Sequence, residues 1–326
     1  MGDSPGVQQA RSASDSAWGR LGRAPQALLL AAAGLLVAGP CLPLFGGAAV
    51  YGDVTARNVV GTAVGVAGVL AFGWAMKIAF AGRRWFWKLL AVPIALVTLQ
   101  FYAMPMVVGG LAVNAPQRDV PSAATLEVRG ARDVAFRSAD GVRLAGWYVP
   151  GRSRAAVILA HGSHDTRMST VPHLRLLSEL GYGVLAYDAR GHGESGGTPN
   201  ALGWRGVLDL AGAVRFLRTQ PHVDGRRIGV LGLSMGAEEG LRAAADGVPL
   251  AAVIADGAGA STTADAEAEG HHGLELLVER LGFRAASALS STPEPPALVS
   301  RVDRIRRPVL LIASGREGEI EINRAL

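Results

Sequence analysis

Residues 232–236 read G-L-S-M-G and lie where two kinds of periodicity meet. The run before them, Ile228–Leu231, is short and apolar like a buried strand, whereas Met235–Ala245 repeats apolar residues at helical spacing. Ser234 therefore occupies a tight turn from a strand into a helix. The flanking glycines suit such a turn, because a side chain at either position would collide with the neighbouring strand or helix.

Short apolar runs and helical patterns alternate on both sides of this turn. Runs rich in Val, Ile, Leu and Ala are typical of the interior of a parallel sheet. The alternation predicts a doubly wound, mostly parallel α/β domain over residues 122–326. The expected strands are Ala155–Ala160, Gly183–Tyr187, Ile228–Leu231, Ala251–Ala255 and Val309–Ala313, and the expected helices are Val171–Leu180, Trp204–Thr219 and Met235–Ala245.

A hairpin is expected at the start of this domain. The segments Asp133–Ser138 and Val142–Val149 alternate apolar and polar residues, and an Asp-Gly pair lies in the connection Ala139–Gly141. Such a pair between two alternating runs favours two antiparallel strands joined by a tight turn.

The G-x-S-x-G pattern at 232–236 matches a nucleophile elbow, in which Ser234 projects beside a helix N-terminus. The strand Ala155–Ala160 leads into a loop that begins at His161. In this arrangement the backbone N–H groups of Ser163, in that loop, and of Met235 form an oxyanion hole. The alternative is a chance pentapeptide in a chain with 43 glycines.

A third motif follows the next strand, where residues 188–195 read D-A-R-G-H-G-E-S. With its H-G, D-x-R-G-x-G-x-S and G-x-S-x-G segments in this order, the chain resembles the α/β-hydrolase superfamily over about residues 124–313, particularly its serine aminopeptidase-like and dienelactone hydrolase-like branches. The resemblance implies that Asp188, Arg190 and His192 brace the loops around the site and are not catalytic.

The resemblance also places a catalytic acid after the strand Val309–Ala313, where Glu317 is the expected residue. Glu319 and, more weakly, Asp256 remain alternatives, and so does a pair of solvated loop glutamates at 317 and 319. A carboxylate is needed there because it fixes the tautomer of the catalytic histidine and stabilises the imidazolium.

The histidine of the superfamily follows the acid, and this sequence departs from that pattern. No histidine follows Glu317, and we expect the chain to stop before the last strand, its helix and the catalytic histidine. His271 and His272 fall in an expected cap, residues 257–300, and are expected to be exposed loop residues. The seven histidines are His161, His164, His173, His192, His222, His271 and His272.

The N-terminal third has a different composition from the rest of the chain. Hydrophobic residues make up 49% of the chain and charged residues only 18%, and residues 24–52, 58–76 and 89–117 carry no charge. A helix needs about 20 apolar residues to cross a bilayer. We therefore expect a transmembrane region over residues 27–113, with a buried helical hairpin as the alternative. The expected spans are Ala27–Tyr51, Val59–Phe80 and Leu89–Val113.

Basic residues around these spans predict their orientation. Three precede the first span, one lies between the first two and three precede the third. Because basic loops stay in the cytoplasm, residues 1–26 are expected there and the α/β domain outside. The first stretch also fits a signal peptide, whose cleavage would leave two spans.

Composition narrows the function further. The net charge of +5 comes without a run of basic residues, so no nucleic-acid partner is expected, and the single Cys41 excludes a disulfide framework and a Cys-based zinc site. No metal or other cofactor is expected. We predict a membrane-anchored serine hydrolase acting on a small-molecule or peptide ester, thioester or amide. The alternative is a catalytically inactive membrane protein whose hydrolase-like domain binds a ligand or partner.

Overall fold

The structure is a computed structural model that describes residues 30–35, 38, 41, 56–79, 91–113, 118–197, 200, 202–313 and 317–326. The chain forms two compact units, Met1–Met104 and Pro105–Leu326. The boundary lies inside the expected transmembrane region, seventeen residues before the expected start of the α/β domain. The expected segment 1–26 and most of the expected span Ala27–Tyr51 lie outside the described residues.

The described part of the first unit is helical and apolar. Helix α3, Ala56–Ala79, contains Val59–Ile78, the one stretch among the described residues that is long and apolar enough to cross a membrane. Its Leu70 is 67% exposed, so part of the apolar surface of this helix is not covered by the rest of the chain. Helix α5, Ala91–Thr98, continues through a π-helical turn, Leu99–Ala103, towards the second unit.

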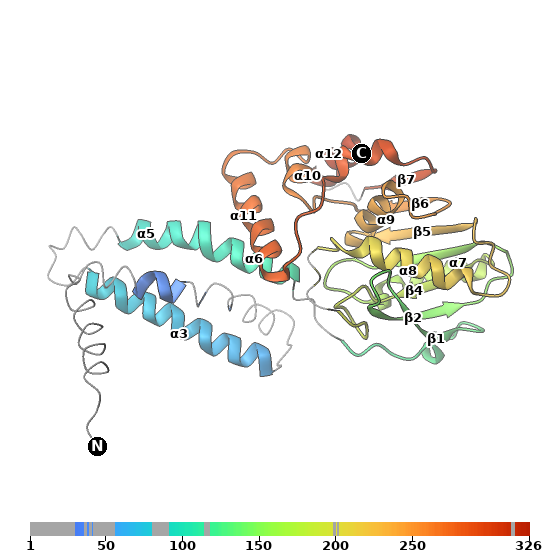
Figure 1. Ribbon diagram of the computed structural model, residues 1–326, viewed down its shortest axis with the longest axis horizontal. Coiled ribbons are helices and arrows are strands. Elements are labelled where there is room, and N and C mark those ends of the chain that lie inside the picture. The colour runs from blue at the N-terminus through green and yellow to red at the C-terminus, as the bar shows by residue number, and fades with distance from the viewer. Residues whose placement is uncertain are drawn as a thin grey trace, which may run out of the picture. The chain divides into compact units, whose positions relative to one another are not determined.

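The second unit contains a seven-stranded sheet in the order β1-β2-β4-β3-β5-β6-β7, which confirms the predicted α/β class (Figure 1). The first two strands form the predicted antiparallel hairpin, and β2 pairs antiparallel with β4. The remaining pairs are parallel. The strands are β1 Arg132–Arg137, β2 Arg143–Val149, β3 Ala156–Ala160, β4 Gly183–Tyr187, β5 Ile228–Leu233, β6 Val253–Asp256 and β7 Val309–Ile312.

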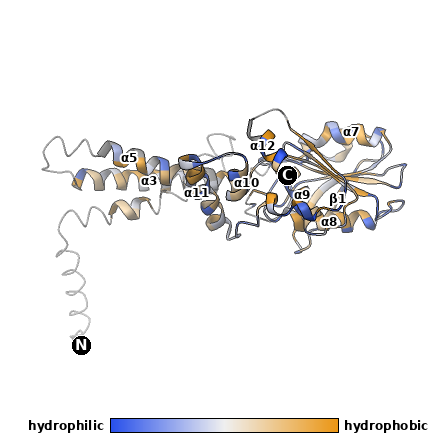
Figure 2. Ribbon diagram, turned by 90° about the horizontal axis from the view of Figure 1, so that it is seen from above, coloured by the Kyte–Doolittle hydropathy of each residue, from blue (hydrophilic) through white to orange (hydrophobic). Residues whose placement is uncertain are grey.

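Both faces of the sheet are covered, because successive strand residues point to opposite sides. Each face of the sheet carries a cluster of buried hydrophobic residues. In β4, Leu185 belongs to the cluster on one face and Val184 belongs to the cluster on the other. Helix α7, Val171–Glu179, packs on the second of these faces, and helices α8, Gly206–Arg218, and α9, Met235–Ala245, pack on the first (Figure 2). Short 3-10 turns lie at Ala123–Leu126 and Arg167–Thr170.

A helical segment follows β6 in the region where the cap is expected, residues 257–300, and is called the cap below. It contains α10, Thr263–Ala268, and α11, Gly273–Ser290, and then the 3-10 turns Leu298–Ser300 and Val302–Arg304. A buried ion pair fastens it to α9, with Arg242 Nη2 2.9 Å from Asp265 Oδ2. The Trp204 indole donates to the carbonyl of Ser261 at 2.8 Å, which fixes the start of the cap.

Helix α6, Met104–Val113, ends inside the second unit. A Cβ atom placed on Gly109 would lie 2.7 Å from both the carbonyl oxygen of Gly282 and the backbone nitrogen of Ala286, so α6 crosses α11 at backbone contact. Ala112 and Val113 belong to a buried cluster with Trp204 and Ala286. The last turns of the expected third span are therefore packed against the cap.

Helix α12, Glu317–Ala325, follows β7 and buries Ile322. Residues 317 and 319 therefore lie in a helix and not in a loop. Strand β7 pairs with β6 along one edge, and no described strand pairs with its other edge.

Candidate active site

Ser234 connects β5 to α9 in a strained backbone conformation, with φ 50° and ψ −117°. Its N–H donates to the carbonyl of Asp256 at 2.7 Å. A side chain on Gly232 would collide with the backbone of Gly236, and one on Gly236 would collide with Ala160 of β3. Only glycine fits at either position, so the turn is the sharp elbow that the sequence predicts.

The loop after β3 lies directly beside this serine. Strands β3 and β5 pair with Ala160 opposite Gly232, so their carboxyl ends emerge side by side. A Cβ atom placed on Gly162 would lie 3.5 Å from Ser234 Cβ. Neither Ser163 nor Met235 donates its backbone N–H to a described residue. These two N–H groups are the ones expected to form the oxyanion hole, and both are available to bind a substrate oxygen.

His161 holds the same loop against the loop after β4. Its Nδ1–H donates to the carbonyl of Gly162 at 2.7 Å, and its Nε2 accepts the N–H of Ala189 at 3.0 Å. Both ring nitrogens are therefore used by a neutral imidazole, and burial lowers its pKa. The ring packs edge-on against His192, with centroids 5.0 Å apart, and burial lowers the pKa of His192 to about 3. Both histidines are bracing residues.

His164, three residues after His161 in the same loop, is bonded on both ring nitrogens. Its Nε2 lies 2.6 Å from the carbonyl oxygen of Leu111 in α6, so this nitrogen carries the proton. The Ser163 hydroxyl then donates to Nδ1 at 3.0 Å. His164 has φ 60°, a left-handed conformation that is uncommon for a residue other than glycine. No motif indicates this link, because Leu111 belongs to the apolar segment.

Asp188 anchors the loop after β4 through buried charges. Its carboxylate pairs with Arg167 and accepts the backbone N–H of Arg167 at 2.8 Å and of Glu194 at 3.0 Å. The Arg167 guanidinium also pairs with Glu194 and lies 4.7 Å from the centre of the Trp147 ring. These contacts give Asp188 a bracing role, as the resemblance implies.

Arg190 connects the same loop to α8 and to the β1–β2 turn. It bonds Asp209 at 2.7 Å and Asp140 at 2.8 Å, and these bonds hold the pKa of Asp140 well below its usual range. Ser195 donates to the carbonyl of Asp188 at 2.6 Å. Apart from the exposed Glu194, the polar side chains of this motif are therefore buried within the protein.

The expected acids lie on different elements. Glu317 and Glu319 belong to the first turn of α12, the helix that follows β7 in the chain, and Asp256 is the last residue of β6. Among the described residues, no side chain forms a hydrogen bond with Ser234 Oγ, and none of the histidine rings is bonded to it. The structure therefore brings together Ser234, Ser163 and Met235, and leaves the acid and the base as sequence-based expectations.

Both cap histidines have local roles. His271 Nδ1 lies 2.8 Å from a Glu279 carboxylate oxygen, which raises the pKa of this histidine. His272 is exposed and donates from Nδ1 to the carbonyl of Gly270 at 2.7 Å. His272 matches the expectation of an exposed residue, whereas His271 is ion-paired.

Helix α9 carries two buried glutamates that the sequence analysis does not single out. Glu238 accepts the N–H of Gly259 at 3.2 Å, and burial raises its pKa to about 8. Glu239 packs against Gly203 and Gly206, and its carboxylate oxygens form no hydrogen bond with a described residue. Burial raises its pKa well above the usual value. Two adjacent glutamates in a helix whose other residues are apolar or glycine, apart from Arg242, are the signal that could have found them.

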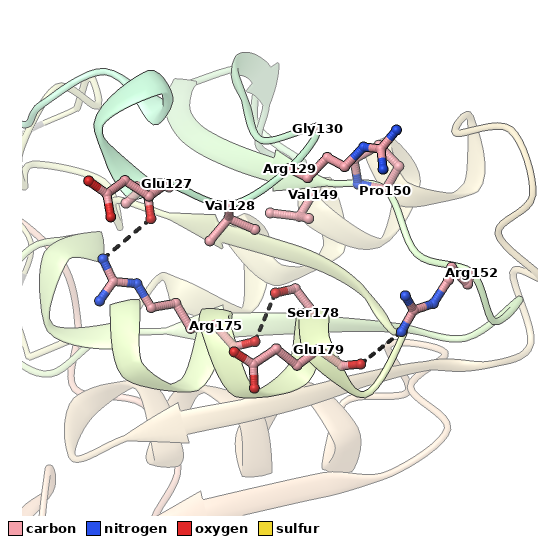
Figure 3. A pocket seen from close by; sticks show the side chains of 11 residues that line it. Glu127, Val128, Arg129, Gly130, Val149, Pro150, Arg152, Arg175, Ser178 and Glu179 are labelled. Atoms are coloured by element: carbon pink, nitrogen blue, oxygen red, sulfur yellow. Dashed lines mark hydrogen bonds between the residues drawn. The ribbon is translucent and has the colours of Figure 1, made fainter.

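Several pockets formed by described residues do not have Ser234 in their lining. One of about 620 Å³ is lined by the turn before β1, the end of β2 and α7, with Arg175 donating to the carbonyl of Leu126 and Arg152 to that of Glu179 (Figure 3). Its rim is exposed and charged. No group of three metal-ligating side chains occurs among the residues that the structure describes.

Comparison with known proteins agrees with this geometry. Residues 151–282 match the serine aminopeptidase family S33. An esterase of Pyrococcus furiosus superimposes with a TM-score of 0.51 at 27% identity, over 65% of this chain and 83% of the esterase. The second unit belongs to the α/β-hydrolase superfamily.

Two curated relatives extend the comparison. An uncharacterised protein of Mycobacterium tuberculosis is 33% identical over 201 residues, which is 61% of this chain and 66% of that protein. A thiohydrolase of Eupenicillium brefeldianum is 35% identical over 123 residues, which is 36% of this α/β-hydrolase and 40% of the thiohydrolase. The chain thus spans just under two thirds of the first relative and less than half of the second.

Proposed function

We propose that the chain is a membrane-anchored serine hydrolase that cleaves an ester, thioester or amide through an acyl-enzyme on Ser234. The observation that supports this most is the strained Ser234 at the start of α9, beside the unbonded N–H groups of Ser163 and Met235. A thioester is a reasonable first substrate to try because one relative is named a thiohydrolase.

In the proposed reaction Ser234 Oγ attacks the substrate carbonyl carbon, and the N–H groups of Ser163 and Met235 bind the oxyanion that forms. The serine proton passes to a base and then to the leaving alcohol, thiol or amine. Water attacks the acyl carbon in the second step and restores the hydroxyl. Glu317 is the proposed acid that orients the base. No histidine follows Glu317 in the sequence, and we assign none of the seven to the base.

Labelling with a fluorophosphonate tests the nucleophile. We expect slow labelling of the chain at Ser234, because a serine without an aligned base keeps only the contribution of the oxyanion hole. Ser234→Ala should abolish it. Ser178→Ala is the matched control, because this hydroxyl on α7 bonds only Arg175 of its own helix. Labelling that survives Ser234→Ala would overturn the assignment.

A second function is favoured by one observation, that no described histidine is bonded to Ser234. The hydrolase-like unit would then bind a ligand or partner without turning it over. A folded chain that shows no labelling even after prolonged exposure to the fluorophosphonate would favour this alternative.

We further propose that the helical segment spans the membrane three times and places the hydrolase unit outside the cytoplasm. The exposed apolar surface of α3 and the uneven basic residues around the expected spans support this. A reporter fused after Leu326 that works only outside the cytoplasm should be active. Activity of a cytoplasmic reporter alone would show an even number of crossings.

A further inference from the structure

The first half of the cap helix α11 exposes a row of leucines. Leu274 is 57% exposed and Leu277 is 40% exposed, and Leu281 continues the row half-buried. These positions are three and four residues apart, so they share one face of the helix. An exposed row of apolar side chains of this kind marks a contact surface.

This face lies next to the seam between α11 and α6. At 100° per residue, the seam residues Gly282 and Ala285 lie about a quarter turn around the helix from the leucine row. Helix α6 ends a charge-free helical stretch, 91–113, in which Met104 is 44% exposed. The leucine row therefore lies beside the seam with a helix that ends a charge-free stretch.

Basic residues border the row. Arg280 and Arg284 are exposed on the same side of α11 and form no ion pair with a described residue. They line a shallow hollow of about 390 Å³ that also contains Glu267 and Glu294. Leucines flanked by unpaired arginines are the composition of a helix that lies in a membrane interface, with the cations at anionic headgroups.

We propose that α11 rests on an anionic bilayer surface, with Leu274 and Leu277 inserted among the acyl chains. A second copy of the chain is the competing occupant. The bilayer is favoured because α6 continues the apolar stretch, and because unpaired arginines beside leucines match headgroups above acyl chains. This inference rests on the proposed membrane attachment, and it places the oxyanion loop, tied to α6 through His164, next to lipid.

Depth-dependent quenching tests the contact without relying on catalysis. Cys41→Ser removes the single cysteine of the full chain, and Leu277→Cys then carries a nitrobenzoxadiazole fluorophore. The protein is reconstituted in nanodiscs of phosphatidylcholine and phosphatidylglycerol containing spin-labelled lipid. Leu176→Cys on α7 is the matched control, because Leu176 is also exposed, at 55%, on a different helix.

We expect quenching at position 277 to exceed that at position 176 by about threefold or more, as for a side chain inserted below the headgroups. Replacing phosphatidylglycerol by phosphatidylcholine, or introducing R280E and R284E together, should reduce that excess. Equal quenching at 277 and 176 in a chain that remains in the nanodisc would overturn the inference and leave the attachment intact.

Two other outcomes overturn the inference differently. A chain that does not incorporate into nanodiscs rejects the membrane attachment, and the surface proposal with it. Unquenched fluorescence at 277 that shifts with protein concentration identifies α11 as an interface between copies. Neither outcome bears on Ser234, which the labelling experiment tests separately.

Discussion

The Nε2 atom of His164 lies 2.6 Å from the carbonyl oxygen of Leu111. This bond joins the loop beside the nucleophile to the last turn of an apolar helix. A carbonyl in the last turn of a helix has no partner within the helix, so an imidazole N–H satisfies it well. The other ring nitrogen bonds Ser163, the residue expected to supply one oxyanion donor. The apolar helix α6 is therefore a structural part of the candidate active site.

The first prediction concerns this bond. His164→Ala should slow fluorophosphonate labelling of Ser234 by about tenfold, less than the loss of a whole oxyanion donor, because it loosens Ser163 without removing its N–H. The rate constant for labelling measures this. His222→Asn is the control, since His222 is exposed and also has a positive φ, which asparagine tolerates. Equal rates for the two variants would contradict a positioning role.

The second prediction concerns the crossing of α6 and α11. Gly109→Ala should lower the free energy of unfolding by about 1 to 3 kcal/mol, because the new Cβ meets backbone atoms of α11 that cannot rotate away. Thermal unfolding in detergent measures the change. Gly73→Ala in α3 is a matched control because no atom lies within 4 Å of its added Cβ. A similar change in both variants would mean that α6 does not pack on the cap.

The third prediction follows from the buried Glu238, which is 8% exposed. Burial raises its pKa from 4.5 to about 8, so the folded state keeps a proton that the unfolded chain releases. Stability should therefore fall as the pH rises between about 4.5 and 8, by at most about 1.4 kcal/mol per pH unit from this group.

Glu238→Gln should flatten that decline and stabilise the protein at pH 8, with little effect at pH 4. Glutamine keeps an oxygen that can accept the N–H of Gly259. Denaturant unfolding at the two pH values measures the difference, and Glu179→Gln, at an exposed position on α7, serves as the control. A variant that is less stable than the parent at pH 8 would show that the carboxylate is ionised in the folded state.

The sheet was predictable from sequence because its strands are nearly continuous apolar runs bounded by glycine and polar residues. Predicted strands such as Gly183–Tyr187 and helices such as Met235–Ala245 match the structure at both ends. The elbow at Ser234 was also predictable, because a glycine lies two residues before the serine and another two residues after it, at the point where a strand pattern changes to a helix pattern.

The long-range polar contacts were not predictable. The bond between His164 and Leu111 joins residues 53 positions apart, and nothing in an apolar helix shows which carbonyl is used. The burial of Glu239 was equally hidden, because its space is created by Gly203 and Gly206 on a different element. Period and composition identify faces of helices and strands, whereas such contacts depend on how those faces meet.

The last prediction concerns the edge of the sheet at β7. Leu310 is 54% exposed on a strand whose second edge has no described partner, and unpaired apolar edges promote association of chains. Leu310→Lys should therefore increase the monomeric fraction of residues 105–326 in size-exclusion chromatography. Leu180→Lys adds the same charge at the exposed end of α7, away from any edge, and should have a smaller effect. If both substitutions help equally, net charge and not the strand edge controls association.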